Sequence, residues 1–121
     1  MAKIAWANDQ DFARYYHGNE CQARWIGKAM RRGLLVAGFG GAIETAAGEW
    51  VAFLEIPNSE RKPSLYRHVL EGFERVKEEG ATVIKAVCDT SIPRAEELMR
   101  RLGFEPTDET VNGKVLWKWQ N

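Results

Sequence analysis

The sequence predicts an α+β fold in which helices flank one mixed, mostly antiparallel sheet, and three observations carry this prediction. A long amphipathic helix over residues 64–79 separates two apolar segments, 50–56 and 81–88, which a helix of that length joins as neighbouring parallel strands. Short strand-like segments precede this unit, and Asn112-Gly113 near the end of the chain favours a two-residue hairpin turn. A chain of 121 residues has room for one domain around one core.

The start of the chain predicts a short strand followed by a short helix. Residues 3–7 alternate apolar side chains with small or polar ones, which is the period of a strand. Asn8 or Asp9 can then cap a helix that runs through Tyr16, and Gly18 fits the position just after its end.

Residues 20–32 leave two interpretations open. Apolar side chains recur there at helical spacing, Asn19 can serve as an N-cap, and Gly33 fits just after a helix end. The competing interpretation is a strand over residues 24–30. The local pattern favours the helix.

Three apolar segments follow that predict the centre of the sheet. Residues 34–43 form a glycine-bearing strand, residues 45–48 a turn, and residues 50–56 a buried strand that Pro57 ends. Residues 81–88 are rich in β-branched side chains and predict another buried strand.

Two helices are predicted in the second half of the chain. The helix over 64–79 carries an apolar stripe at helical spacing, with Pro63 near its start and Gly80 just past its end. A shorter helix spans residues 93–102 and stops at Gly103. Residues 104–107 and 111–119 then close the chain as a hairpin.

Charge and composition limit the classes of partner. The chain has 17 basic and 17 acidic residues, so it has no bulk attraction to nucleic acid or to an anionic membrane. It also lacks an apolar stretch of the roughly 20 residues that a spanning helix needs, and its N-terminus lacks a signal-peptide pattern. Cys21 and Cys88 lack the spacing of a disulfide framework, which predicts reduced thiols and a cytoplasmic location. Only two histidines are present, and we expect no metal site.

Residues 95–104, Ala-Glu-Glu-Leu-Met-Arg-Arg-Leu-Gly-Phe, carry a family resemblance. They resemble the A-x-x-L-Y-x-x-x-G-F segment of the GNAT N-acetyltransferase superfamily, and the order of elements over residues 34–119 supports this. The resemblance implies one GNAT-like acyltransferase domain over residues 1–121. It also implies a twisted sheet in which strands 50–56 and 81–88 splay apart like a V, with acetyl-coenzyme A entering the gap. It favours the strand interpretation of residues 20–32.

The loop after strand 50–56 departs from the family pattern, so this motif is degenerate. The family has R/Q-x-x-G-x-G/A there, whereas this chain has Glu60 at the basic position and Pro63 and Leu65 at the glycine positions. Pro63 has no N–H to donate, and Glu60 brings a negative charge near a diphosphate. Basic side chains and helix N-terminal amides can partly compensate. The residues expected to contact acetyl-coenzyme A are Leu54, Ile56, Arg61, Lys62, Ser64, Leu65 and Arg67.

The positions that carry the family's chemistry are also incomplete. The tyrosine that often serves as general acid is replaced by Met99, and an asparagine often found nearby by Ile92. Glu55 matches the position of a glutamate that deprotonates the amine in some members, so it is the candidate catalytic base. The alternative for Glu55 is a structural carboxylate paired with an Arg or Lys. Asp89 is a second candidate carboxylate, and Cys88 is expected to be a packed side chain.

The resemblance implies an acyl-coenzyme A-dependent N-acyltransferase that acts on an amine of a small molecule or a protein. The alternative is a catalytically silent GNAT-fold module that binds a protein partner or forms a homodimer. The short chain and the degenerate loop are similar to small GNAT-like proteins of tailed phages, which are virion-associated or host-directed. A silent module predicts an occluded cleft and an exposed apolar patch elsewhere.

Overall fold

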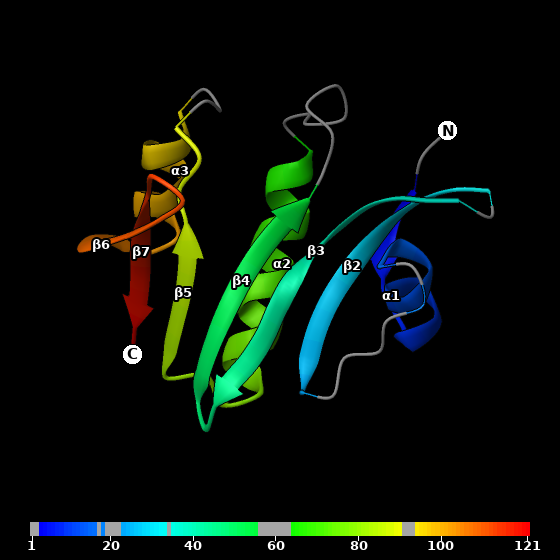
Figure 1. Ribbon diagram of the computed structural model, residues 1–121, viewed down its shortest axis with the longest axis horizontal. Coiled ribbons are helices and arrows are strands. Elements are labelled where there is room, and N and C mark those ends of the chain that lie inside the picture. Colours follow the sequence, from blue (N-terminus) through cyan, green and yellow to red (C-terminus); the bar gives the residue numbers. More distant parts are fainter. Residues whose placement is uncertain (1–2, 17, 19–22, 34, 56–63, 91–93) are drawn as a thin grey trace.

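The computed structural model describes a single seven-stranded sheet with three helices (Figure 1). The described residues are 3–16, 18, 23–33, 35–55, 64–90 and 94–121. The strands are β1 (Lys3–Trp6), β2 (Trp25–Arg32), β3 (Leu35–Ala46), β4 (Glu49–Glu55), β5 (Val83–Val87), β6 (Glu105–Val111) and β7 (Lys114–Gln120). The helices are α1 (Asp9–Tyr15), α2 (Leu65–Glu78) and α3 (Ala95–Arg101).

The sheet has the order β1-β2-β3-β4-β5-β7-β6. Neighbouring strands are antiparallel except β4 and β5, which are parallel and pair Trp50 with Ile84. Helix α2 connects these two strands. The predicted α+β fold, its mostly antiparallel sheet and its parallel central pair are therefore confirmed.

The segment left open by the sequence is a strand. Residues 25–32 form β2, which pairs with β1 on one side (Ile4 with Met30) and with β3 on the other (Ala29 with Phe39). The helix favoured by the local pattern is wrong for these residues, because two ladders of backbone hydrogen bonds outweigh a weak helical propensity. Residues 19–22 lie outside the described part of the chain.

Local signals located α1 and the terminal hairpin correctly. The Asn8 side chain accepts a hydrogen bond from the Asp11 N–H at 2.9 Å, and the Asp11 carboxylate accepts one from the Asn8 N–H at 3.0 Å. This reciprocal pair is a capping box. The Asn112-Gly113 turn has positive φ angles of 52° and 80°, as a two-residue hairpin turn requires. The hairpin inserts β7 between β5 and β6, where Trp117 is buried.

Successive residues of a strand point to opposite faces, so β3 and β4 each serve two cores. Phe39 and Phe53 face α1 and form an aromatic cluster with it. Ala42 and Ala52 face α2 and α3, where the larger core lies. No helix within the described ranges is long and apolar enough to cross a membrane.

Candidate active site

Strands β4 and β5 separate at one end of the sheet. Their pairing ends at Ala52 and Ala86, but β4 continues against β3 to Glu55. Strand β5 continues against β7, where Val87 pairs with Leu116. Figure 1 shows the two strands diverging toward these ends. The V-shaped splay implied by the resemblance is present.

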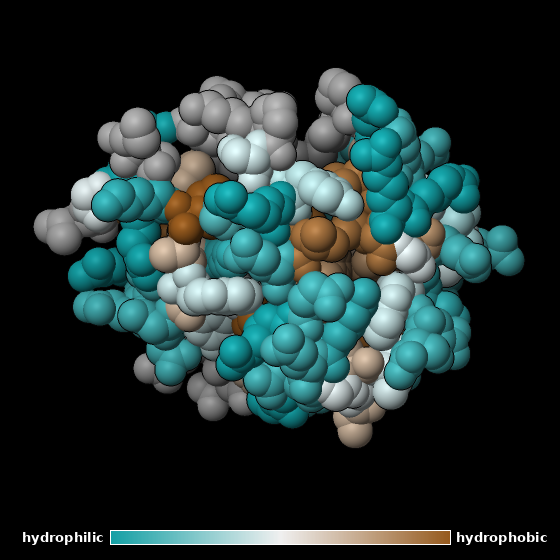
Figure 2. All heavy atoms as spheres, turned by 180° about the vertical axis from the view of Figure 1, so that it is seen from behind, coloured by the Kyte–Doolittle hydropathy of each residue, from teal (hydrophilic) through white to brown (hydrophobic). Residues whose placement is uncertain are grey.

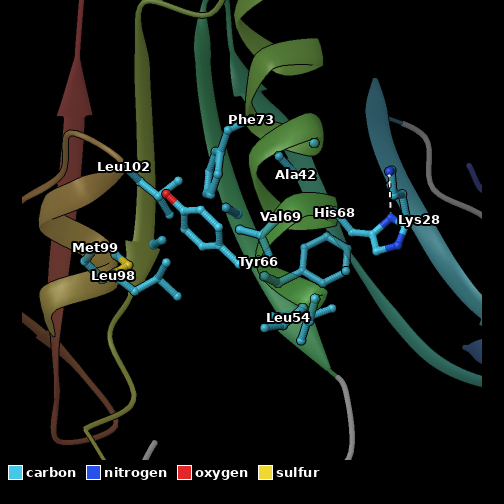
Figure 3. A pocket seen from close by; sticks show the side chains of 18 of the residues that line it. Lys28, Ala42, Leu54, Tyr66, His68, Val69, Phe73, Leu98, Met99 and Leu102 are labelled. Atoms are coloured by element: carbon cyan, nitrogen blue, oxygen red, sulfur yellow. Dashed lines mark hydrogen bonds between the residues drawn. The ribbon is translucent and has the colours of Figure 1, made fainter. Parts of the chain in front are cut away.

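A cavity of about 710 Å³ lies between the sheet and helices α2 and α3, and the splayed strands border it. In Figure 3, Leu98 and Met99 of α3 and its C-cap Leu102 lie at one end, and Lys28 and His68 lie at the other. Most of the lining side chains are apolar. Figure 2 shows this face from outside, with hydrophobic atoms exposed between hydrophilic side chains. The cavity has the size and apolar lining of a small-molecule site.

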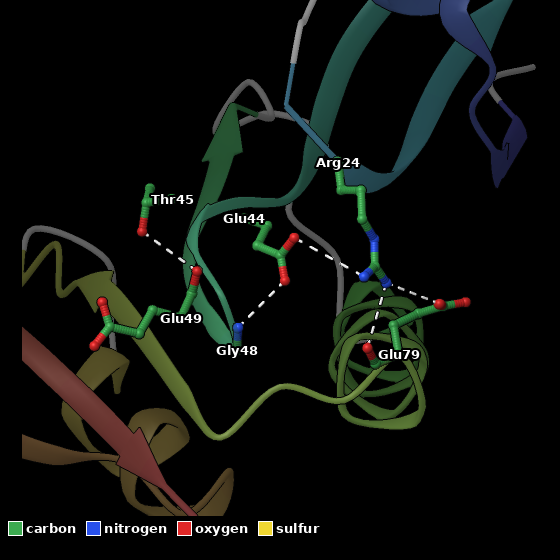
Figure 4. A network of polar contacts seen from close by, with 6 residues as sticks. All are labelled: Arg24, Glu44, Thr45, Gly48, Glu49 and Glu79. Atoms are coloured by element: carbon green, nitrogen blue, oxygen red, sulfur yellow. Dashed lines mark hydrogen bonds and ion pairs between the residues drawn. The ribbon is translucent and has the colours of Figure 1, made fainter.

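The opposite end of the V is closed by a polar network (Figure 4). The Arg24 guanidinium donates to the Glu79 carboxylate at 2.9 Å and to the Glu79 carbonyl at 3.3 Å, and it lies 3.9 Å from Glu44. Glu44 in turn accepts a hydrogen bond from the Gly48 N–H at 3.3 Å. The end of α2 is thereby joined to β2 and to the β3–β4 turn, so the strands open only at the cavity end.

The described candidates for donor binding lie at the splay and at the start of α2. Leu54 and Leu65 line the cavity, Leu54 at the splay and Leu65 at the start of α2. Ser64 is the N-cap of α2, and its hydroxyl makes no capping hydrogen bond. Arg67 is exposed and lies 3.8 Å from Glu71. The remaining loop candidates, Ile56, Arg61 and Lys62, lie outside the described residues, together with Glu60 and Pro63.

Glu55 lies at the end of β4 on the α1 face of the sheet, across from the α2 cavity. Its carboxylate Oε1 accepts a hydrogen bond from the Tyr16 hydroxyl at 3.2 Å. Its backbone carbonyl accepts one from the Tyr15 hydroxyl at 3.4 Å. Among the described residues, these contacts are with phenols rather than with the Arg or Lys of the structural alternative.

Both tyrosines remain protonated donors at neutral pH. Burial is the largest cause that raises the pKa of Tyr16 above its usual value of 10.0, and the Glu55 carboxylate adds to it. The pKa of Tyr15 is raised by the same two causes in the same order. Each phenol therefore keeps its proton beside Glu55 and orients the end of β4.

The other described residues considered for a catalytic role are either buried in the core or lie beside an opposite charge. Met99 is buried in α3 and lines the cavity. Cys88 is buried, and burial raises the pKa of its thiol, so it is a neutral packed side chain as expected. Asp89 lies 3.5 Å from the Lys114 ammonium. Ile92 lies outside the described residues.

The sequence did not identify the polar group at the far end of the cavity. The Lys28 ammonium lies 3.1 Å from His68 Nδ1 and donates to the Glu71 carboxylate at 2.6 Å. It also lies 4.5 Å from the centre of a Trp6 ring. Burial is the main cause that lowers the pKa of His68, so this ring is neutral at neutral pH. His68 and Glu71 share a helix face, but their partner in β2 is 40 residues or more away in sequence.

Solved structures similar to this chain include acetyltransferases. A Bacillus subtilis acetyltransferase in complex with CoA is 17% identical, with 100% of this chain and 99% of that chain covered and a TM-score of 0.62. The ribosomal-protein-S18-alanine N-acetyltransferase of Escherichia coli is 16% identical over 99% and 94% of the two chains, with a TM-score of 0.67. The GNAT domain of S. lividans PAT is 13% identical over 94% and 78%, with a TM-score of 0.63.

These likenesses extend over nearly the whole chain and show the fold that the resemblance implied. No protein-family model matches the sequence, and no curated protein matches it. At such low identity the shared property is the architecture, and the function has to be argued from the site.

Proposed function

We propose that this protein is an acyl-coenzyme A-dependent N-acyltransferase. The observation that carries the proposal is the splay of β4 and β5 into the apolar cavity, with Glu55 at the end of the same strand. A neighbour with this architecture was crystallised in complex with CoA. Cys21 and Cys88 lack the spacing of a disulfide framework, which fits a reducing compartment, so we place the protein in the cytoplasm.

The N-terminus of α2 and the splayed strands supply the means to hold the donor. The first turn of α2 contains no acidic residue, so the free N–H groups after Ser64 and the helix dipole favour a phosphate. Arg67 adds a positive charge in that turn, and Arg61 and Lys62 precede it in sequence. The backbone of β4 beyond Ala52 has no pairing with β5, so it can bind an extended arm of the donor.

In the transfer, the acceptor nitrogen attacks the thioester carbonyl, a C–N bond forms and the C–S bond breaks. Glu55 accepts the proton that the nitrogen loses. Backbone N–H groups at the splay stabilise the negative charge that develops on the carbonyl oxygen. Met99 cannot donate a proton to the leaving sulfur, and none is required, because a thiol with a pKa of about 8.5 leaves readily as a thiolate.

The silent-module alternative predicts an occluded cleft. The open cavity of about 710 Å³ at the splay instead supports a small-molecule site. The degenerate loop and the similarity to phage proteins still support the silent module as the alternative. A failure to bind coenzyme A would favour it.

Thermal unfolding with and without millimolar acetyl-coenzyme A tests the proposal, with desulfo-coenzyme A as a second ligand and ATP as a nucleotide control. A ligand at about 100 times its dissociation constant adds about 2.7 kcal/mol to the free energy of unfolding. We expect Tm to rise by several degrees with both coenzyme A ligands and by less with ATP. No rise at saturating concentration would contradict the proposal.

A pair of charge reversals locates the binding site. Arg67 and Arg75 are both exposed on α2, and each pairs with a glutamate four residues later. Arg67→Glu should reduce the rise in Tm, because it puts a negative charge beside the phosphate-binding end. Arg75→Glu, at the other end of the helix, should leave it unchanged.

A further inference from the structure

The cavity floor contains a trough that runs across four strands. Trp6, Lys28, Gly40 and Leu54 pair with one another in a row from β1 to β4, so they share one face of the sheet. Three strand spacings give this row a length of about 14 Å. Gly40 in the middle has no side chain, and the Leu54 side chain takes the space above it, since a Cβ built on Gly40 would lie 2.8 Å from Leu54 Cδ1.

The roof of the trough, helix α2, also leaves space. Gly72 lies in the middle of this helix and lines the cavity, and a Cβ built on it meets no atom within 4 Å. Glycine is less favourable than alanine inside a helix. Folding stability alone therefore does not explain a glycine here, whereas an open cavity does.

The space between roof and floor is apolar. Leu65, Val69 and Phe73 line it from α2, and Ile26 and Met30 from β2. Figure 3 shows Leu54 near the end of its strand, Val69 above it, and the Lys28–His68 pair at the far end of the space. Protein interiors are normally close-packed, and an apolar hollow of this size attracts an apolar ligand.

One end of the trough meets the point where the thioester would lie. Leu54 is the penultimate residue of β4 at the splay, and Val87 at the end of β5 and Cys88 just after it border the same cavity. A chain attached to the thioester carbonyl can thus extend past Leu54, between the sheet and α2, toward Lys28. There the ammonium is already held by Glu71, so the far end offers no free charge for a charged acyl tail.

We propose that this trough binds the acyl chain of the donor, and that the preferred donor carries an apolar chain longer than acetyl. The inference rests on the proposed acyl-transfer function and specifies its substrate class.

Binding measured by calorimetry with coenzyme A and its acetyl, butyryl, hexanoyl and octanoyl thioesters tests it. Each methylene that enters the trough should tighten binding by up to about fourfold. We expect at least a tenfold lower Kd for hexanoyl- than for acetyl-coenzyme A. This series uses the unaltered chain and does not depend on any variant folding.

Substitutions at Gly72 then locate the chain. Gly72→Phe should abolish the gain from hexanoyl and octanoyl chains and leave the Kd of acetyl-coenzyme A within about twofold, because the ring fills the trough and not the splay. Gly72→Ala is the matched control and should retain most of the gain. Thermal unfolding without ligand checks that both variants fold.

The outcomes separate the two proposals. Equal affinity for all thioesters would overturn the chain-binding inference while the proposed function stands. A chain-length gain that persists in a folded Gly72→Phe variant would also overturn it. Failure of coenzyme A and every thioester to bind would overturn both.

Discussion

The two faces of the sheet differ in packing near the splayed end of β4. On the α1 face, Phe39 is fully buried, stacks on Phe53 with ring centroids 5.9 Å apart and meets the edge of Phe12 at 5.6 Å. On the α2 face, the neighbouring positions of the same strands are Gly40 and Leu54, and a cavity lies over them.

We infer that the α1 face supports the end of β4, whereas the α2 face leaves space for a ligand. The aromatic side packs tightly around α1, whose Tyr16 holds the Glu55 carboxylate. The other side keeps the space that a ligand needs. Because side chains alternate along a strand, β4 can present a base to one face and a binding surface to the other.

The largest expected effect is on Glu55, the reactive group of the packed face. Glu55→Gln should lower kcat by about a hundredfold to ten-thousandfold, because the amide cannot accept the proton, and should leave the Kd for acetyl-coenzyme A nearly unchanged. Glu49→Gln, at the other end of the same strand, is the control. Release of coenzyme A thiol with a panel of amines is the measurement. Equal turnover of Glu55→Gln and the unaltered chain from about pH 6 to about pH 9 would remove Glu55 from the mechanism.

Matched truncations test the packing difference itself. Phe39→Ala should lower the free energy of unfolding by about 4 kcal/mol, because it opens a cavity among packed rings. Phe73→Ala, on the face that already contains a cavity, should cost about half as much, since Phe73 borders open space. Denaturant unfolding measures both, and equal losses would contradict the contrast between the faces.

The ion pair under α1 gives the packed face a pH dependence. The Arg31 hydrogen bond is the main cause that lowers the pKa of buried Asp11 below its usual 3.8. Asp11→Asn should cost about 2–3 kcal/mol near pH 7, from the lost charge pair and the altered cap.

The sign of this pH effect follows from the lowered pKa. The stabilisation is fully present above the unfolded-state pKa near 3.9 and is lost as the pH falls through the lower folded-state pKa. The difference between the unaltered chain and Asp11→Asn in urea unfolding should therefore shrink below about pH 4. A difference that is constant down to pH ~3 would show that the charge of Asp11 is not the cause. Glu97→Gln, which removes a carboxylate from an exposed pair with Arg94, should change stability much less.

The smallest expected effect is a gain on the open face. Gly72→Ala should stabilise the protein by about 1 kcal/mol, because alanine is the better helix former and its Cβ meets open space. Gly103→Ala should instead destabilise it, since Gly103 has φ of 90° and a Cβ there would lie 3.1 Å from Trp119. Thermal unfolding compares the two, and a loss of stability in Gly72→Ala would show that this space is filled.

Local patterns were sufficient for some elements. The helix cap at Asn8 or Asp9, the apolar stripe of α2 and the Asn112-Gly113 turn each depend on residues close in sequence, and each was predicted. The segment that became β2 was not decided by its local pattern, because its partners are β1 and β3. Residues 56–63 of the expected phosphate loop lie outside the described part of the chain, so their contacts stay a prediction.

Some features of the candidate site also follow from local sequence, and others depend on contacts between distant residues. Apart from β2, the sequence by itself determined the order of the elements, and it also determined the position of Glu55 at the end of a central strand, since both follow from short-range periodicity. Only the tertiary structure placed Tyr16 on Glu55, 39 residues apart, and joined Lys28 to His68, 40 residues apart. It also decided that a cavity remains on the α2 face, because the space there depends on how far α2 lies from the sheet. A residue's neighbours across a sheet come from register and packing, which the chain establishes only when it folds.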